Sequence, residues 1–409
     1  MATIIFHFIL IACIAWFGSK RVANGLGKKW FWIGIGMRFC GAAAFALIYV
    51  VWIGTGDTIH FFSHGSDLAS LAKTDFSSYL DYIFSSQHDM YKSDRRDGFF
   101  IKIVSFFCLA TNNNYWITTT YFALISFFSS WYFVGNLYKV STQKYALIFA
   151  FLIFPTPIFW TSGLMKDTIV WSAIVVAIGS ILKIKQRPGG ITIGTIFLIS
   201  LALFLLFELR YFLFGATLGL IIITLVDQFI GKRQLSKPQK WTIWLSLFLL
   251  VLTSISLLNP NLYLHNFPQA LFDNYEQIIQ NSESGKFLVF DLKPTWVSIF
   301  KNLPTSLLSG LFRPFPGEGG WFYLLHGLEN ILTLATTIYS VLKIRSISAP
   351  GTTALAALFF ILVLASLTPL ASPNFGTLMR YKAAYLPFLA YFATFIPFKT
   401  LFPNQSIKG

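Results

Sequence analysis

The stretch that decides the fold is TALAALFFILVLASLTPLA, residues 353–371. It is apolar and uncharged over a length that can cross a hydrocarbon core of about 30 Å as a helix. Across the whole chain 55% of the residues are hydrophobic and only 11% are charged, whereas a soluble protein carries about 25% charged residues. Similar apolar runs recur along the sequence, without the alternating pattern of a β-barrel. The sequence therefore predicts a bundle of membrane-spanning helices.

These runs predict an all-α, polytopic bundle of ten or eleven spans that forms a single integral membrane domain, residues 1–409. The count depends on the first run, which is short and either crosses the membrane or lies along its surface. Two long loops, 54–114 and 259–320, contain shorter apolar stretches that we expect to form interfacial or re-entrant helices at 99–110 and 296–312. The spans are expected at residues 3–18, 31–53, 115–138, 145–162, 166–183, 190–208, 211–230, 241–258, 321–342, 353–371 and 382–399.

The charged residues predict the orientation of the spans. Basic residues gather, without any Asp or Glu, in every second connection: residues 18–30, 139–144, 183–187, 232–240 and 343–345. Of the sixteen acidic residues, only Asp227 is expected near the same face. Because basic loops stay in the cytoplasm, we expect the C-terminus inside and both long loops outside. The net charge of +15 thus reflects orientation, and nucleic-acid binding is not expected because no soluble basic domain is present.

The first long loop opens with Gly54-Thr55-Gly56-Asp57-Thr58-Ile59-His60, directly after a predicted span. A carboxylate that lies near the bilayer and is shielded from water can have a raised pKa, which suits general acid–base chemistry. Asp57 is therefore the candidate catalytic residue, and His60, one helical turn later, is a candidate substrate contact. The alternative is structural, because Asp57 also suits the N-cap of a surface helix that continues through Phe61.

A second candidate follows Pro155 and Pro157, which interrupt a helix at membrane depth and free backbone carbonyls there. Lys166 and Asp167 then begin the next helix, where the helix dipole favours the acid and disfavours the lysine. The position of Lys166 therefore predicts an anionic partner. That partner is a substrate or a protein carboxylate, unless the lysine snorkels to the headgroups.

Isolated arginines are also expected on the outer side, against the orientation rule. A guanidinium offers a planar fork of donors that matches a phosphate. The candidate substrate-binding residues of this class are Arg210, Arg313 with Glu318, and Arg380. The alternative is that one or two of these arginines pair with Glu208, Glu318 or Glu329. The histidines form no set with metal-ligand spacing, and the mixed-charge run 92–97 is expected to be a solvated surface.

Four short motifs resemble those of bacterial membrane proteins of surface-polysaccharide assembly. They are Gly56-Asp57, the Pro-Thr-x-x-x-Trp-x-Ser-x-x-x-Lys-Asp pattern from Pro155 to Asp167, Arg-Pro-Phe-Pro-x-Glu from Arg313 to Glu318, and Asn-x-Gly-Thr-x-x-Arg-Tyr from Asn374 to Tyr381. The chain is similar in these motifs to the GT-C superfamily of polyprenyl-phosphate-dependent glycosyltransferases and to O-antigen polymerase-like proteins.

The resemblance implies a transferase of the bacterial inner membrane that takes a polyprenyl-linked sugar on the outer face and passes it to a glycan or lipid acceptor. An acid in the first outer loop serves that superfamily as a base or as a metal ligand, and Asp57 occupies the matching place. The superfamily often has two adjacent acids, whereas Gly56 precedes Asp57 here, so a lone base is favoured over a divalent metal and no cofactor is assigned. The acidic loop usually follows the first span, which favours the ten-span alternative.

Two other functions stay open. The proline-broken segment 155–163 is compatible with a transporter or a flippase for a lipid-linked oligosaccharide, because broken helices bind substrates in transporters. A non-catalytic assembly subunit is the third possibility. The transferase is preferred because the ionisable candidates gather on one face, where cations can stabilise a phosphate leaving group and a carboxylate can deprotonate an acceptor.

Overall fold

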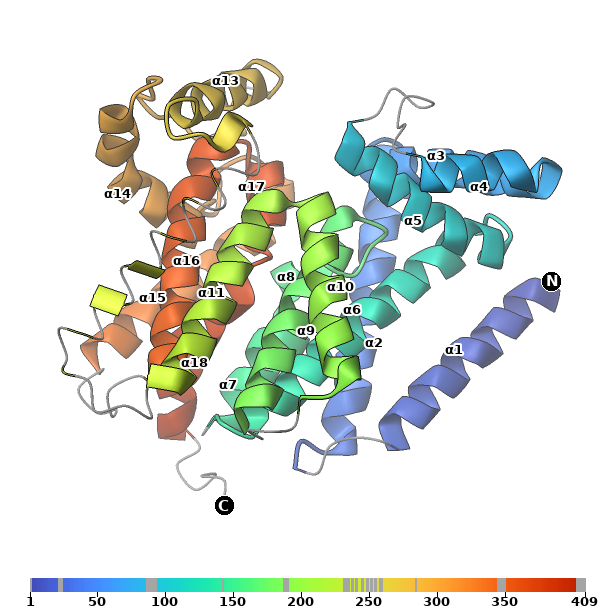
Figure 1. The fold of residues 1–409 in the computed structure, drawn as a ribbon, viewed down its shortest axis with the longest axis horizontal. Coiled ribbons are helices and arrows are strands. Elements are labelled where there is room, and N and C mark those ends of the chain that lie inside the picture. Colours follow the sequence, from blue (N-terminus) through green and yellow to red (C-terminus); the bar gives the residue numbers. More distant parts are fainter. Residues whose placement is uncertain are drawn as a thin grey trace. The chain divides into compact units, whose positions relative to one another are not determined.

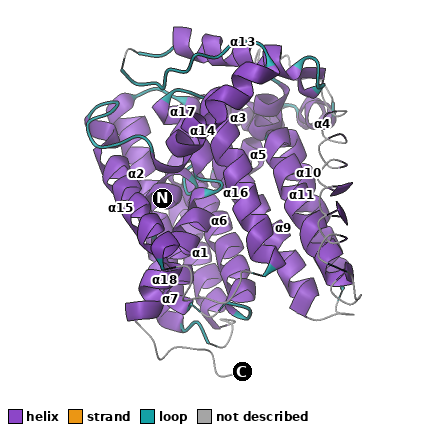
Figure 2. Ribbon diagram, turned by 90° about the vertical axis from the view of Figure 1, so that its left-hand side faces the viewer, coloured by secondary structure: helices purple, strands orange, loops and turns teal. Residues whose placement is uncertain are grey.

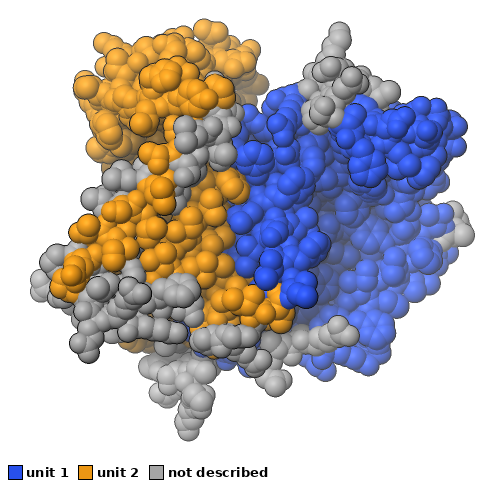
Figure 3. All heavy atoms as spheres, viewed as in Figure 1, with its two compact units in different colours: residues 1–140, 152–179, 193–211 blue, residues 141–151, 180–192, 212–409 orange. Residues whose placement is uncertain are grey.

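The computed structural model describes residues 2–20, 25–85, 94–141, 143–186, 191–230, 260–283, 285–343 and 351–401, with isolated positions between 236 and 256. Within those ranges the chain is all-helical and has no β-strand, as the sequence predicts (Figure 2). An isolated antiparallel bridge joins Phe287 and Asn374. The chain divides into two compact units, residues 1–140, 152–179 and 193–211 in unit 1 and residues 141–151, 180–192 and 212–409 in unit 2 (Figure 3).

Five helices of the described part are long and apolar enough to cross a membrane by length and composition. They are α1 (Ala2–Lys20), α2 (Lys28–Ala46) with its continuation η1 (Leu47–Ile53), α6 (Tyr115–Tyr138), α9 (Lys166–Gln186) and α16 (Thr352–Ala371). Each coincides with a predicted span. The membrane class of the chain is therefore supported by the helices themselves.

Further helices occupy other predicted spans. They are α7 (Lys144–Ile148), η3 (Phe149–Ile153) and α8 (Pro155–Trp160) in succession, then α10 (Ile193–Leu209), α11 (Tyr211–Ile230), α15 (Leu324–Leu342) and α18 (Leu386–Leu401). The predicted span 241–258 and the basic connection 232–240 lie outside the described residues, apart from isolated positions. The helix positions therefore follow the hydropathy pattern wherever the two can be compared.

In unit 1 the first long loop is itself helical. It forms α3 (Asp57–Thr74), α4 (Phe76–Phe84) and α5 (Arg95–Thr111), which lie together beyond the end of η1 (Figure 1). Close packing of α3 on α5 depends on Gly65, because a Cβ atom there would lie 2.6 Å from Val104 Cγ1. The apolar stretch 99–110 is thus the body of α5, and its partner is a protein helix.

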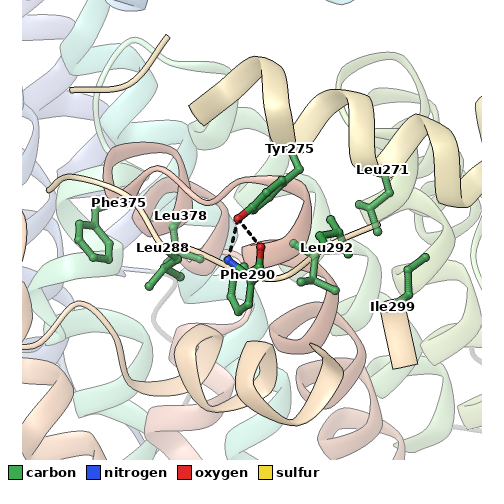
Figure 4. Close-up of a cluster of buried hydrophobic side chains, with 9 residues drawn as sticks. Leu271, Tyr275, Leu288, Phe290, Leu292, Ile299, Phe375 and Leu378 are labelled. Carbon is green, nitrogen blue, oxygen red and sulfur yellow. Dashed lines mark hydrogen bonds between the residues drawn. The ribbon is translucent and has the colours of Figure 1, made fainter. Parts of the chain in front are cut away.

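In unit 2 the second long loop forms η4 (Pro260–Leu262), α13 (Phe267–Gln280) and α14 (Trp296–Phe312), followed by η5 (Trp321–Tyr323); α17 (Phe375–Lys382) comes later in the chain. Buried side chains from α13, from the extended segment after it, from α14, α16 and α17 share one apolar cluster (Figure 4). The Tyr275 hydroxyl donates to Phe290 O at 3.2 Å and accepts from Phe290 N at 2.7 Å. The loop therefore has a packed core that anchors α17.

Candidate functional site

Asp57 lies in the first turn of α3. Gly54 and Gly56 have φ angles of 70° and 123°, conformations that suit glycine, and they turn the chain out of η1. The N-cap is Gly56, so the alternative that Asp57 caps this helix is wrong by one residue. The carboxylate instead sits where the helix dipole favours an acid. Its side chain is exposed on the protein, so the protein itself does not shield it from water.

His60 is also exposed and lies one turn further along α3. Its ring meets the ring of His64 edge to face at a centroid distance of 4.4 Å. Phe61, the next residue, is buried against Phe100 of α5, with a centroid distance of 4.9 Å. The start of α3 therefore has an exposed polar side, with Asp57 and His60, and a buried aromatic side that packs on α5.

Lys166 begins α9, and its ammonium group forms an ion pair with the carboxylate of Asp97 on α5. The same ammonium lies 5.1 Å from the centroid of the Phe61 ring. The prediction of an anionic partner for Lys166 is thus met by a protein carboxylate that is 69 positions away in the sequence. Asp97 belongs to the run 92–97, which was expected to be solvated. Asp97 is partly buried, so that expectation is wrong for this residue. Positions 92 and 93 lie outside the described residues.

Asp167 pairs with Arg210, which lies between α10 and α11. The distance from Arg210 Nη2 to Asp167 Oδ1 is 3.3 Å, and each side chain is only 7% exposed. Such a pair is expensive to desolvate, and each charge depends on the other. The predicted site residues Lys166, Asp167 and Arg210 are therefore brought together, but each cation contacts an acid of the protein.

A third pair completes this arrangement. Arg95 Nη2 donates to Glu208 at 2.9 Å and 3.2 Å from its two oxygens, while the Arg96 guanidinium lies 4.8 Å from the Tyr211 ring centroid. We call Arg95, Asp97, Lys166, Asp167, Glu208 and Arg210 the charge network. Its three cations and three acids balance, and Arg95 is its outermost member, with a side chain that is 64% exposed. Arg95, Arg96 and Asp97 were not among the predicted site residues.

Unit 2 holds the remaining candidates. Arg313 pairs with Glu318, with Nε 3.1 Å from both carboxylate oxygens, so the predicted alternative of a local pair holds for this arginine. Burial acts to raise the pKa of Glu318, but the hydrogen bonds from Arg313 and Phe315 N and the charge of Arg313 together lower it. Arg380 lies in the last turn of α17 and is partly buried.

Lys382 is a polar centre that the sequence argument missed. Its side chain is completely buried, and Nζ donates to Asn330 Oδ1 at 2.8 Å and to Arg313 O at 3.3 Å. Asn330 also donates to Pro314 O at 2.8 Å. Lys382 therefore holds the backbone of the Arg313–Glu318 segment. Its position directly after the Arg380-Tyr381 pair was the available signal.

Comparisons with known protein families, with curated proteins and with solved structures find no match. Among the described residues, no group of three or more His, Cys, Asp or Glu side chains is placed to hold a metal ion.

Proposed function

We propose that the protein is a membrane glycosyltransferase or polymerase of surface-polysaccharide or glycoconjugate assembly, resembling the GT-C superfamily. It would use a polyprenyl-phosphate-linked sugar donor on the non-cytoplasmic face of the bacterial inner membrane. The observation that carries the proposal is the contact of Lys166 with Phe61. Phe61 lies about one helical turn after Asp57 in α3. The charge network thus contacts the first turns of α3, the helix that begins with the candidate base.

The chemistry requires these two kinds of group. The acceptor hydroxyl oxygen attacks the anomeric carbon of the donor, and its proton passes to the Asp57 carboxylate. The bond from the anomeric carbon to the phosphate oxygen breaks, and the polyprenyl phosphate leaves with the electron pair. The exposed guanidinium group of Arg95 and the half-buried one of Arg96, at the rim of the charge network, are suited to the leaving phosphate. Lys166 and Arg210 fix the geometry of the network behind them.

The proposed orientation places the C-terminus in the cytoplasm and both long loops outside. Both loops also expose apolar side chains: α4 exposes Phe76 and Phe84, and α14 exposes Val297 and Phe300. Exposed apolar faces on helices outside the spans suit contact with the membrane surface. Helices that lie on the membrane surface would hold Asp57 close to the headgroup of a lipid-linked donor.

The test is complementation of a strain that lacks the protein, scored by surface glycan and by the amount of protein in the membrane. The Asp57→Asn variant should accumulate normally and lose glycan, because a missing general base reduces a rate by about 10²–10⁴-fold. Asp67→Asn is the matched control, since Asp67 is an exposed acid on the same helix. Normal glycan in the Asp57→Asn strain would reduce Asp57 to a helix-terminal charge.

A transporter or flippase for a lipid-linked oligosaccharide is the second candidate. A specific feature favours it: residues 161–165 interrupt the helices between α8 and α9, and a buried arginine of α2, Arg38, contacts the break. Substrate-binding sites of transporters use broken helices. Movement of the lipid-linked glycan across sealed vesicles, without a new glycosidic bond, would favour this function over the transferase.

A further inference from the structure

Arg38 is a charged residue inside an apolar helix. It lies about 15 Å along α2 from Lys28, at a rise of about 1.5 Å per residue, and only 1% of its surface is exposed. Among the ion pairs of the described residues, none involves Arg38. A buried cation without a carboxylate is costly, and ionisable residues within spans are rare for that reason. Some requirement of the fold or of the function must therefore keep it there.

The hydrogen-bond acceptors of Arg38 are neutral oxygen atoms. Nη1 donates to the carbonyl oxygen of Thr161 at 3.3 Å, to its hydroxyl oxygen, and to Ser162 Oγ at 3.4 Å. Nη2 donates to Ser130 Oγ on α6 at 3.0 Å, which also accepts a hydrogen bond from Trp171 Nε1 on α9 at 2.9 Å. One guanidinium group thus connects α2, α6 and the turn between α8 and α9.

The backbone of the turn 161–165 needs hydrogen-bond donors. Residues 161–165 are not helical, yet all of them are buried, and a carbonyl freed from a helix in an apolar interior must find a partner. The hydroxyl groups of Thr161 and Ser162 donate to Pro157 O and Ile158 O, both at 2.6 Å. Their oxygens are then oriented to accept from Arg38. A cation at the C-terminal end of α8 is also favoured by the helix dipole.

The packing of α2 supports the same role. Arg38, Gly41 and Phe45 are spaced by three and four residues, so they share one face of α2. A Cβ atom on Gly41 would lie 2.6 Å from Ile158 Cγ2 on α8, and one on Gly163 would clash with the Phe45 ring. The turn 161–165 therefore packs closely against α2, and Arg38 makes the polar contact on that face of α2.

We propose that Arg38 is a positioning residue whose guanidinium group fixes the buried turn 161–165 and thereby the place where Lys166 and Asp167 enter the charge network. Arginine suits this task because its donors form a rigid planar fork that reaches several acceptors at once. The inference does not rest on the transferase proposal, because it concerns the position of the turn and applies equally to a transporter.

The test is the reactivity of a cysteine placed in the turn. In a chain whose native cysteines at positions 13, 40 and 108 are replaced, Met165→Cys serves as the reporter and Met379→Cys as the control in the other unit. The two methionines are 3% and 0% exposed, so both positions should react slowly with a water-soluble maleimide. Arg38→Met should raise the rate at position 165 by roughly tenfold or more, since several charge-assisted hydrogen bonds are lost, and should leave position 379 unchanged. Arg38→Lys, which keeps the charge but not the fork, should give an intermediate rate.

Two results would overturn the proposal. One is an unchanged rate at position 165 in Arg38→Met; the other is an equal rise at both positions, which would indicate global loosening. If Arg38→Met does not accumulate, Thr161→Val carries the test, because it removes one acceptor of Arg38 and keeps the side-chain shape. It should raise the rate at position 165 several-fold and only there, and no rise would contradict the positioning role.

Discussion

The buried pair of Asp167 and Arg210 allows a quantitative test of the charge network. Both side chains are 7% exposed, and the contact joins Arg210 Nη2 to Asp167 Oδ1 at 3.3 Å. Arg210→Met leaves a desolvated carboxylate, which costs about 3–5 kcal/mol in the free energy of unfolding. Asp167→Leu leaves a desolvated guanidinium with a similar cost. The double variant removes both charges, so it should be closer to the wild-type protein than either single variant.

The assay is denaturant-induced unfolding of the purified protein in detergent, followed by the fluorescence of its 12 tryptophans. The pair Lys286 and Glu283 is the control, because its side chains are 42% and 77% exposed. Breaking that pair should cost less than about 1 kcal/mol. Additive losses, with the double variant as unstable as the sum of the singles, would refute a coupled buried pair.

Three further predictions concern unit 2. Lys382→Met leaves the Arg313 carbonyl oxygen and the Asn330 amide oxygen without the buried donor that each has in the wild-type protein. It should lower the free energy of unfolding by about 1–3 kcal/mol; an unchanged melting temperature would contradict this. Asn374→Ala removes the N-cap side chain of α17, which accepts a hydrogen bond from Gly376 N at 2.9 Å. The variant should lose about 1 kcal/mol in the free energy of unfolding, and an unchanged melting temperature would count against the cap. Gly310→Ala places a methyl group against the carbonyl of Ala365 and should lower the free energy of unfolding by about 1–3 kcal/mol or more. The control Gly36→Ala, whose added methyl group meets nothing within 4 Å, should be tolerated. Equal melting temperatures of the two variants would refute this packing.

Hydropathy predicted the positions of the helices because a membrane-spanning helix must form all its backbone hydrogen bonds internally and expose apolar side chains to lipid. That requirement is local, so residues 353–371 predict α16 without knowledge of its neighbours. Cap residues are less securely predicted, as the shift from Asp57 to Gly56 at the start of α3 illustrates. A glycine in a suitable conformation can serve there, although Asp is the better cap by side chain.

The partners of the charges could not be predicted, because they are distant in the sequence. The helix dipole indicated that Lys166 needs an anion, but nothing local points to Asp97, and Arg95 and Glu208 are 113 positions apart. Arg38 and Lys382 were missed for a different reason. Their hydrogen-bond partners are hydroxyl, amide and backbone oxygens, and such groups are too common along the chain to be recognised as partners from the sequence.

The most direct test of the proposed function is a transfer reaction in vesicles that contain the purified protein. The donor is the radiolabelled pool of polyprenyl-linked sugars extracted from the host membranes. We expect that label moves from the lipid into a new glycosidic linkage, that Asp57→Asn slows this transfer at least about 10²-fold, and that Asp67→Asn does not. Label that crosses the bilayer without a new bond, or an undiminished rate in Asp57→Asn, would contradict it.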